Sequence, residues 1–197
     1  MRILTIADEE AKRFYDFYKP GMLDEYDLII SCGDLSRHYL EFLVTMAHCP
    51  LLYVPGNHDD SFVQHPPEGC ICIDDDIFEY QGVRFLGLGG SFKYRNSGEY
   101  MYTETEMKRR ILKLKLKLFR HKGFDVLVTH SPIFEYGDKE YLAHRGFLCF
   151  QELLKKYKPK YMIHGHIHLN YGYKLPKTYT YQDVTIINAY EYYNLDY

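Results

Sequence analysis

The sequence predicts an α/β protein built around mixed β-sheet, and three observations lead to this prediction. Short apolar runs alternate with amphipathic stretches over residues 2–54, which is typical of parallel strands joined by helices. Two apolar runs flank Gln81-Gly82, a turn signal that adds an antiparallel hairpin. The chain has 197 residues, of which 46% are hydrophobic, and this is enough to bury one substantial core. We therefore expect a single domain spanning residues 1–197.

The first part of the chain predicts three strands separated by two helices. Each strand candidate is a short apolar run, and each helix candidate repeats its apolar residues at helical spacing. Parallel strands of this kind are joined by right-handed crossovers. The expected elements are a strand at 2–7, a helix at 11–18, a strand at 27–31, a helix at 37–47 and a strand at 51–54.

The pattern changes after residue 70. Short runs at 71–73, 77–80 and 83–86 predict strands, of which the last two form the hairpin. The segment 87–102, rich in glycine, serine and tyrosine, is expected to be a loop over the functional site. A capping box at Thr103-Glu104-Thr105-Glu106 predicts a helix that ends near residue 120. Strands at 126–129 and 160–163 follow, with a helix at 147–157 between them and short aromatic strands ending with 184–188.

The long helix after the capping box carries basic residues on one face. At about 100° per residue they lie on the same side of the helix, with apolar residues covering the rest. Such a face could contact a phosphate backbone, but a solvated surface is the simpler interpretation in a chain of net charge −3. The residues are Arg109, Arg110, Lys113, Lys117 and Arg120.

The composition and the N-terminal stretch limit which partners and which cellular location we expect. The net charge of −3 argues against a protein whose whole surface binds nucleic acid. The apolar stretch 2–7 is too short for a signal peptide or a membrane span, so we expect a cytoplasmic protein without a membrane partner. Five cysteines without a C-x-x-C pair predict reduced thiols, with redox or metal chemistry at Cys70 and Cys72 as the alternative. Tyrosines clustered from Tyr171 to Tyr197 predict a half-buried strand face or an oligomer interface, with nucleobase stacking as the alternative.

Candidate metal ligands stand directly after the predicted strands. Glycines precede several of them, which lets the chain turn sharply off a strand and approach a ligand closely. Because the carboxyl ends of parallel strands meet at one edge of a sheet, we expect these side chains to converge. His164 precedes its glycine and is expected to have a supporting or core role. The candidates are Asp8, Asp34, Asn57, His58, His130, His166 and His168.

The ordered motifs strongly resemble those of the calcineurin-like metallophosphoesterase family, over Asp8 to His168. In chain order they are an aspartate, Gly-Asp, Gly-Asn-His-Asp, a lone histidine and Gly-His-x-His, a highly specific combination. The resemblance implies a sandwich of two mixed β-sheets flanked by α-helices, with two divalent metal ions at the strand ends. In this family pattern Asp34 bridges the ions, which share a hydroxide that attacks phosphorus.

The resemblance also assigns the ligands of each ion. The first ion would be held by Asp8, the residue in the position of Glu10, Asp34 and His168. The second would be held by Asp34, Asn57, His130 and His166.

The first motif departs from the family pattern. The pattern there is Asp-x-His, whereas this chain has Asp8-Glu9-Glu10. Glu10 is long enough to place an oxygen where an imidazole nitrogen would lie, and the alternative is a solvated carboxylate with water completing the metal shell. With Glu10 as a ligand, three carboxylates surround the first ion, which favours Mn²⁺ over Zn²⁺. We expect two divalent ions, with Mn²⁺ first and Fe, Zn, Mg or Ni as alternatives.

Four residues are candidates for catalysis or substrate binding: His58 and Asp59 for catalysis, and Arg37 and Asn57 for substrate binding. In the family pattern His58 binds no metal and points at the substrate, where it would stabilise or protonate the leaving group. Asp59 could fix the tautomer of His58. Arg37 could reach the phosphate, because a guanidinium fork matches phosphate oxygens. Asn57 is a second candidate for a contact with the phosphate. The simpler interpretation of Arg37 is a solvated side chain.

These features together predict a dinuclear metal-dependent phosphoesterase acting on a small phosphoester. We expect a phosphodiesterase, because no added cap domain is evident and an open cleft suits a diester; a phosphomonoesterase is the nearest alternative. A non-catalytic binding scaffold is the alternative outside the enzymes, since the first-motif histidine is missing. A nuclease directed by the basic helix is a third hypothesis, so nucleic acid is a possible but not favoured partner. Tyr94, Arg95 and Asn96 are candidates to line the cleft.

Overall fold

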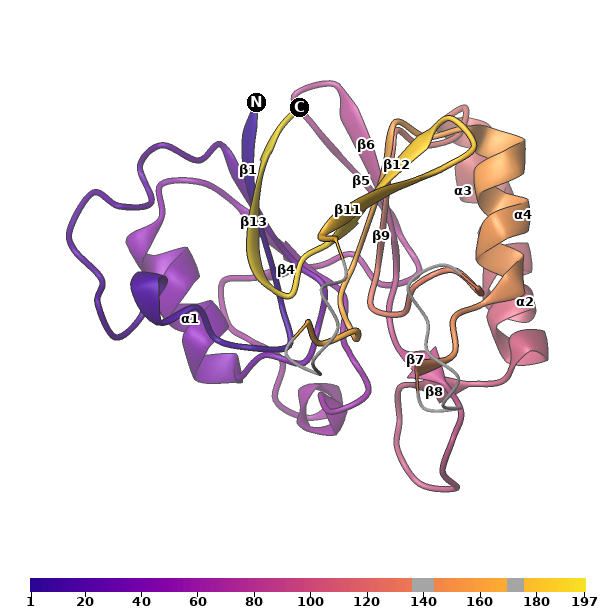
Figure 1. The fold of residues 1–197 in the computed structure, drawn as a ribbon, viewed down its shortest axis with the longest axis horizontal. Helices are drawn as coiled ribbons and strands as arrows, with labels where there is room; N and C mark the ends of the chain where they lie inside the picture. Colours follow the sequence, from indigo (N-terminus) through magenta and orange to yellow (C-terminus); the bar gives the residue numbers. More distant parts are fainter. Residues whose placement is uncertain (136–143, 170–175) are drawn as a thin grey trace.

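The computed structural model describes residues 1–135, 144–169 and 176–197. These residues form two large β-sheets with helices on their outer sides (Figure 1). The first sheet has the strand order β13-β1-β2-β3-β4. Helix α1 (Arg37–Met46) packs on its outer face. The strands are β1 (Arg2–Ala7), β2 (Leu28–Ser31), β3 (Leu51–Tyr53), β4 (Ile71–Cys72) and β13 (Glu191–Asp196).

The second sheet has the strand order β11-β12-β10-β9-β6-β5. Its strands are β5 (Ile77–Tyr80), β6 (Val83–Leu88), β9 (Val126–Thr129), β10 (Tyr161–His164), β11 (Thr178–Tyr181) and β12 (Val184–Asn188). Its outer face is covered by α2 (Glu104–Lys113), α3 (Lys115–Arg120) and α4 (Leu148–Tyr157) (Figure 1). A separate short pair consists of β7 (Ser91–Phe92) and β8 (Met101–Tyr102).

Alternation of buried side chains along the strands explains the layers. In β1, Ile3 packs between the two sheets whereas Leu4 packs on the α1 side. In β9, Val126 and Val128 face the first sheet and Leu127 faces the helices. Successive strand residues point to opposite faces, so a central strand contributes to two cores at once. This is why these strands are continuous apolar runs in the sequence.

Both sheets have parallel centres; the second sheet has an antiparallel strand at each edge, and the first has one at the β13 edge only. Strands β1 to β4 run parallel, as do β12, β10, β9 and β6. The antiparallel neighbours are β13, β11 and β5, the last through the predicted hairpin with β6. The carboxyl ends of the parallel strands lie at the lower edge in Figure 1. The prediction of two mixed sheets flanked by helices is confirmed.

Several predicted elements differ from the structure. The helix expected at 11–18 is only a short 3₁₀ helix, Lys12–Phe14, because Phe14 packs edge-on against Tyr26 and Tyr192 and this tertiary contact outweighs helical spacing. The capping box is present at Thr103, but the helix that follows is divided at Leu114. The segment 87–102 is partly strand, in β6, β7 and β8. Strand β13, which pairs with β1, was not predicted.

The predicted basic face of this helix is wrong at Arg110. Its side chain is 8% exposed and lies beneath the helix rather than on its surface. The guanidinium donates to Asp74 at 2.6 Å, to Asp75 at 3.0 Å and to the Gly89 carbonyl at 2.8 Å. It also lies 4.3 Å from the ring centroid of Tyr102. Helical periodicity grouped Arg110 with the other basic residues, but it could not show that Asp74 and Asp75 lie opposite the guanidinium.

The predictions for the tyrosine-rich tail and for membrane spans can be compared with the structure only over the described residues. Tyr171 and Tyr173 lie outside the described residues. The described tyrosines of the tail are buried or half-buried on strands β11 to β13 and at Tyr190 and Tyr197, in line with a half-buried strand face. Within the described part of the chain, none of the helices has the length and apolarity required to cross a bilayer.

Candidate metal centre

The candidate ligands lie just after the carboxyl ends of parallel strands in both sheets. Asp8 follows β1, Asp34 follows β2, His130 follows β9 and His166 follows β10. Three of them adopt left-handed backbone conformations, with φ of 65° at Asp8, 58° at Asp34 and 68° at His166. Non-glycine residues rarely adopt this region, and strain of this kind concentrates at functional sites. The sharp turns aim side chains from the two sheets at one point.

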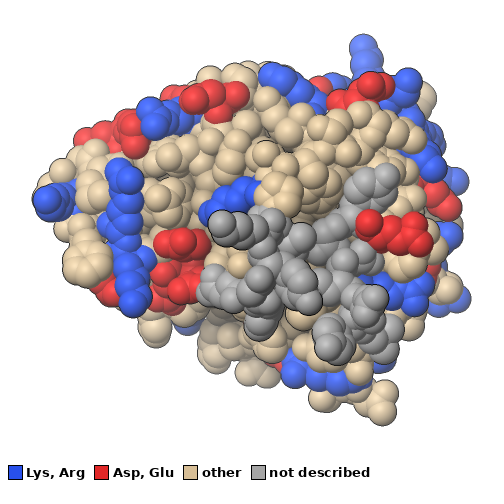
Figure 2. Space-filling view, in the orientation of Figure 1, with Lys and Arg blue, Asp and Glu red and all other residues tan. Residues whose placement is uncertain are grey.

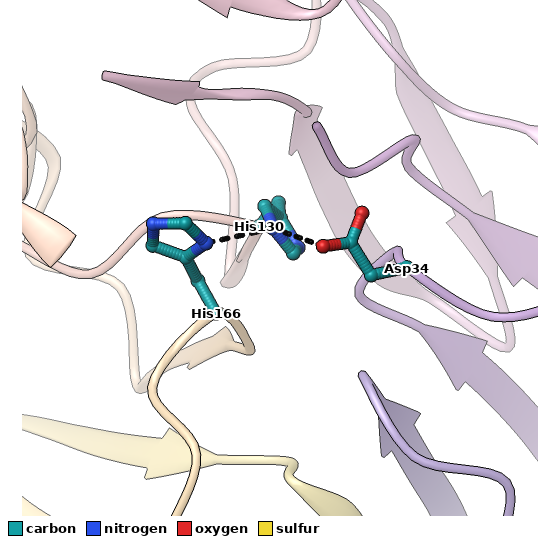
Figure 3. A group of neighbouring side chains, drawn as sticks. All are labelled: Asp34, His130 and His166. Atoms are coloured by element: carbon teal, nitrogen blue, oxygen red, sulfur yellow. Dashed lines mark hydrogen bonds and ion pairs between the residues drawn. The ribbon is translucent and has the colours of Figure 1, made fainter. Parts of the chain in front are cut away.

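Asp34, His130 and His166 form the centre of the site (Figure 3). One ligand atom from each residue lies within 4.8 Å of the others. His130 Nε2 lies 3.3 Å from Asp34 Oδ2 and 3.1 Å from His166 Nδ1. The side chain of His130 is fully buried, and that of Asp34 is 8% exposed. One carboxylate and two imidazoles at these separations match the donor set of a divalent transition-metal ion.

The proton positions show that this donor set fits a cation. His130 Nδ1 lies 2.7 Å from the Cys32 carbonyl, which only accepts, so Nδ1 carries a proton. In the neutral ring Nε2 then presents a lone pair towards Asp34 Oδ2, His166 Nδ1 and Asn57 Oδ1, the last at 3.0 Å. A carboxylate, an amide oxygen and two imidazole nitrogens therefore converge, and these are groups that can coordinate a cation.

The pKa values of these groups are consistent with a positive charge at this point. Burial lowers the pKa of His130, but the Asp34 carboxylate, together with Asp8 and the Cys32 carbonyl, raises it to about 9. Burial raises the pKa of Asp34, but His130 and the backbone N–H of His58 hold it below its usual range. Without another cation, a proton on His130 supplies the positive charge. A divalent ion bound by these residues would take the place of that proton.

Asp8 and His168 lie on the other side of the centre. The backbone N–H of His166 donates to both carboxylate oxygens of Asp8 at 2.9 Å. His168 Nε2 lies 3.8 Å from Asp8 Oδ1, and burial lowers the pKa of His168, which keeps the imidazole neutral. Burial raises the pKa of Asp8 to about 7. A buried carboxylate beside a neutral imidazole is a second place where a cation would restore charge balance.

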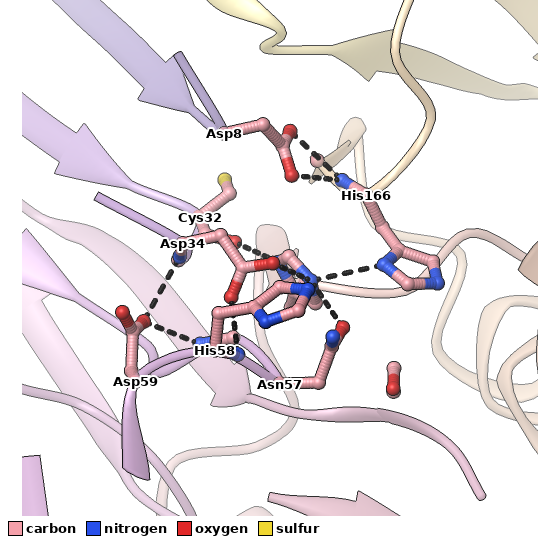
Figure 4. A network of polar contacts seen from close by, with 12 residues as sticks. Asp8, Cys32, Asp34, Asn57, His58, Asp59 and His166 are labelled. Atoms are coloured by element: carbon pink, nitrogen blue, oxygen red, sulfur yellow. Dashed lines mark hydrogen bonds and ion pairs between the residues drawn. The ribbon is translucent and has the colours of Figure 1, made fainter. Parts of the chain in front are cut away.

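Asn57, His58 and Asp59 belong to the turn after β3 (Figure 4). The backbone N–H of His58 donates to Asp34 Oδ1 at 2.8 Å, and the His58 side chain is exposed. Asp59 Oδ2 accepts from the backbone N–H of Asp34 at 2.9 Å and of Gly56 at 2.7 Å. The structure thus joins Asp59 to the backbone of two ligand-bearing turns rather than, as predicted, to the His58 ring.

Two glycines are required for the turns to approach each other. A Cβ on Gly56 would lie 2.1 Å from Asp34 Oδ1, and a Cβ on Gly165 would lie 2.7 Å from Asp8 Oδ2. Both distances are far below van der Waals contact, so any side chain there would displace a candidate ligand. The glycines of the Gly-Asn-His-Asp and Gly-His-x-His motifs therefore make room for carboxylates from other strands.

Glu10 and its neighbour Glu9 are held by different hydroxyl groups. Glu10 Oε1 accepts from Ser36 Oγ at 2.5 Å, and Ser36 also caps α1 through the backbone N–H of Tyr39. The carboxylate of Glu9 accepts from the hydroxyl of Tyr190, whose ring lies 5.1 Å from that of His168. Sequence reasoning missed Glu9, because the spacing of the family motif directs attention to position 10.

The remaining predicted residues lie around this centre or at its edge. Arg37 donates to Glu41 Oε1 at 2.6 Å and to Glu68 Oε1 at 3.1 Å, so its guanidinium is held in ion pairs. Tyr94 and Arg95, from the segment between β7 and β8, contact Asn57: its amide donates to the Tyr94 hydroxyl at 3.3 Å, and Arg95 donates to its carbonyl at 3.3 Å.

Two further histidines complete the surroundings. His164 is fully buried and lies 3.0 Å from the Tyr179 hydroxyl, and burial lowers its pKa to about 4, in agreement with the predicted core role. His144 was missed: its ring centroid lies 5.8 Å from that of His166. It stands outside any apolar run, so the sequence contained no signal for it.

Comparison with known proteins is consistent with this geometry. A protein of Methanocaldococcus jannaschii described as uncharacterized is 25% identical over 187 residues, which cover 85% of this chain and 80% of that protein. A solved structure from Thermus thermophilus has a TM-score of 0.60 at 14% identity, covering 96% of this chain and 89% of its own. GAP50, the anchor in the inner membrane complex of Plasmodium, has a TM-score of 0.56 at 16% identity, covering 95% and 70%. These two structures share the fold.

A family model gives the more specific result. The model described as calcineurin-like phosphoesterase matches residues 4–170, the range that contains every candidate ligand from Asp8 to His168. The sequence motifs that resembled this family, the two mixed sheets and the convergence of ligands at their strand ends agree with the match. The chain belongs to the calcineurin-like phosphoesterase family.

Proposed function

We propose that this protein hydrolyses phosphodiester bonds with two divalent metal ions at the ends of β1, β2, β9 and β10. Family membership implies metal-dependent hydrolysis of phosphoesters. The observation that carries the proposal is the convergence of Asp34, His130 and His166, whose ligand atoms lie within 4.8 Å of one another. One carboxylate and two imidazoles are a donor set that suits a divalent cation, which supports the proposal.

The proposal assigns the ligands of two adjacent positions. Asp34, Asn57, His130 and His166 would hold one ion, and Asp8, Asp34, His168 and Glu10 would hold the other. When bound, the ions supply positive charge for the phosphate oxygens and acidify a water molecule. We favour Mn²⁺, because carboxylates make up a large share of the donors at the position formed by Asp8, Asp34, Glu10 and His168.

The side chains outside the metal positions act on the substrate. His58 is exposed, while its backbone N–H is fixed to Asp34, so its ring is free to face solvent at the mouth of the site. We assign to it the transfer of a proton to the leaving oxygen. Asp59 holds the turns of Asp34 and Gly56 together and is a positioning residue. Arg37 would have to leave Glu41 to reach a phosphate.

The preference for a diester substrate rests on which structure the described residues after the family match form. The family match covers residues 4–170, and described residues after this range enter β11, β12 and β13 of the two sheets. These strands extend the scaffold rather than adding a cap domain. A diester carries a substituent on each side of phosphorus, so a site that has no cap domain among the described residues suits it. The cytoplasmic location stays a prediction.

The test is hydrolysis of bis-p-nitrophenyl phosphate beside p-nitrophenyl phosphate, with Mn²⁺ added to metal-free protein. We expect the diester to be cleaved faster. His58→Ala should lower kcat by about 10²- to 10⁴-fold while Mn²⁺ still binds, because a proton donor is lost and no ligand is. His48→Ala is the matched control, since the His48 side chain is 84% exposed and lies away from the site.

The assay also distinguishes the alternatives. Faster cleavage of the monoester would identify a phosphomonoesterase. Two bound ions without turnover of either ester would identify a non-catalytic scaffold, the hypothesis that the missing first-motif histidine leaves open. Failure of Asp34→Asn to reduce metal binding would refute the assignment of the centre itself.

A further inference from the structure

A groove lies between α2–α3 and α4 on the outer side of the second sheet, outside the proposed metal centre. Its volume is about 410 Å³, and its floor contains Leu118, Cys149 and Leu153. These side chains are at most 5% exposed, so the floor is recessed below the helix surfaces. The lining extends from Thr105 to Leu118 along α2 and α3. At 1.5 Å per residue the groove is about 20 Å long, the length of a helix of about 13 residues.

The rim of this groove is basic. Lys108, Arg109, Lys115 and Lys156 line it, against a single acidic residue, Glu152. Glu152 lies 3.7 Å from Lys108, so these two charges offset each other. In Figure 2 Lys and Arg side chains gather along the right-hand edge, where Figure 1 shows these helices. An apolar floor with a rim of net positive charge is complementary to an acidic amphipathic segment.

The sequence of the helices strengthens the charge argument. Residues 107–122 contain eight Lys or Arg and no Asp or Glu, although the whole chain has a net charge of −3. Arg110 and Lys117 pair with the acidic residues 74–76 of the protein itself. Among the described residues, Arg109, Lys113 and Lys115 have no acidic partner within 4.0 Å, and all three are exposed. The excess positive charge is therefore directed outward.

An exposed apolar stripe borders the groove. Leu112, Leu116 and Phe119 follow one another at helical spacing and are 54%, 58% and 81% exposed. Leu112 also lines the groove, so stripe and groove form one continuous surface. Large side chains exposed together mark interaction sites, whereas single ones do not. We call the groove and the stripe together the α2–α4 surface.

We propose that the α2–α4 surface is a docking site for an acidic amphipathic helix of a partner protein. The apolar face of such a helix packs on Leu112 and enters the groove towards Leu118 and Leu153. Its acidic flanks then lie against Lys108, Arg109 and Lys115 on one side and Lys156 on the other. This is helix-in-groove recognition, in which apolar anchors give affinity and charges give orientation.

The same observations disfavour two other occupants. A second copy related by a two-fold axis would place one basic rim against the other, and like charges disfavour such pairing. A bilayer surface would touch Phe119 and Leu116 but would not reach the recessed floor formed by Leu118 and Leu153. A helical segment fills both parts of the surface.

The experiment uses a fluorescein-labelled helical peptide about 18 residues long, with leucines on one face and glutamates along both flanks. Its control peptide has lysine at every glutamate position. Fluorescence anisotropy with the full chain measures both affinities. We expect the acidic peptide to bind about tenfold more tightly or better, and its affinity to fall as salt is added.

Protein variants locate the binding. Leu112→Gln removes an anchor and Lys115→Glu reverses a rim charge, and each should weaken the acidic peptide about tenfold. Phe17→Gln is the matched control, because Phe17 is 68% exposed and belongs to the first-sheet side of the fold. All three positions are exposed, so circular dichroism and phosphoesterase activity should match the parent protein.

Four results would overturn the proposal. These are equal affinity for the two peptides, no detectable binding of the acidic peptide, unchanged binding by both surface variants, or an equal loss in Phe17→Gln. Phosphatidylserine vesicles that bind the protein in a Leu112-dependent way, without peptide binding, would identify a membrane surface instead. A dimer in sedimentation velocity that Leu112→Gln dissociates would identify a second copy.

Discussion

Arg110 should be one of the most important single side chains for the stability of the second sheet. Its guanidinium is buried under α2 and donates to Asp74, Asp75 and the Gly89 carbonyl. Asp74 Oδ1 in turn accepts from the backbone N–H of Gly89 at 2.6 Å. The Arg110→Met variant keeps the length of the side chain but leaves the Asp74 carboxylate without its counter-charge.

The expected magnitude follows from burial. Removing one partner of a buried ion pair costs about 3–5 kcal/mol, because the remaining charge is left desolvated and unpaired. For a chain of this size, each kcal/mol lowers Tm by roughly 2–4 °C, so Arg110→Met should lower Tm by roughly 6–20 °C. Such a loss is a large fraction of the free energy of unfolding of an ordinary domain, about 5–15 kcal/mol.

Urea unfolding followed by circular dichroism measures the effect. Arg109→Met is the matched control, since Arg109 is the next residue on the helix and is exposed, and it should change the free energy of unfolding by less than about 0.5 kcal/mol. Adding Asp74→Asn to Arg110→Met should restore about half of the loss, because no unpaired carboxylate remains. Equal stability of the two arginine variants, or no rescue by Asp74→Asn, would refute the reasoning.

Three further predictions concern the site and pH. Asp59→Ala leaves two backbone N–H groups without an acceptor and should cost about 2–6 kcal/mol in urea unfolding, whereas Asp59→Asn, which keeps an acceptor oxygen, should cost less than half of that. Glu10→Ala should weaken one of two Mn²⁺ sites by about tenfold or more in calorimetric titration and leave the other intact; unchanged affinity at both would exclude Glu10 as a ligand. Arg84 lowers the pKa of Asp125, so their ion pair stabilises the fold fully above the ordinary aspartate pKa, and this stabilisation is lost as pH falls through the lowered pKa of the folded state. Asp125→Asn should therefore cost about 1 kcal/mol at pH 7 and progressively less as the pH is lowered below the ordinary aspartate pKa, and a cost independent of pH would contradict this.

The sequence contained enough information for the strands and for the positions of the candidate ligands. A central strand buried on both faces must be apolar throughout, so β1, β2, β3, β9 and β10 stand out as continuous runs. The glycine that ends such a run marks the turn, and the polar residue after it must lie at the carboxyl edge. The predicted convergence of Asp34 and His166 depends on this rule, whereas His130 was predicted from its place directly after the run 126–129, without a glycine.

The features that could not be predicted depend on contacts across the fold. Periodicity placed Arg110 on a helix face, but only the packing of α2 shows that Asp74 lies opposite. Asp59 looked like a partner of its neighbour His58, yet its carboxylate serves backbone groups of two turns. The helix expected at 11–18 failed because Phe14 is fixed by aromatic rings distant in the sequence.

Strand β1 acquires its outer neighbour late during synthesis, because Arg2 pairs with Asp196 and Ala7 with Glu191. Until β13 leaves the ribosome, one flank of β1 is an open edge with unpaired amide and carbonyl groups, the kind of edge on which chains aggregate. Closing so large a loop is also entropically slow, so the nascent chain depends on β2 alone to hold β1 in register. Truncating β13 should therefore reduce the yield of soluble protein more strongly than it alters the metal centre.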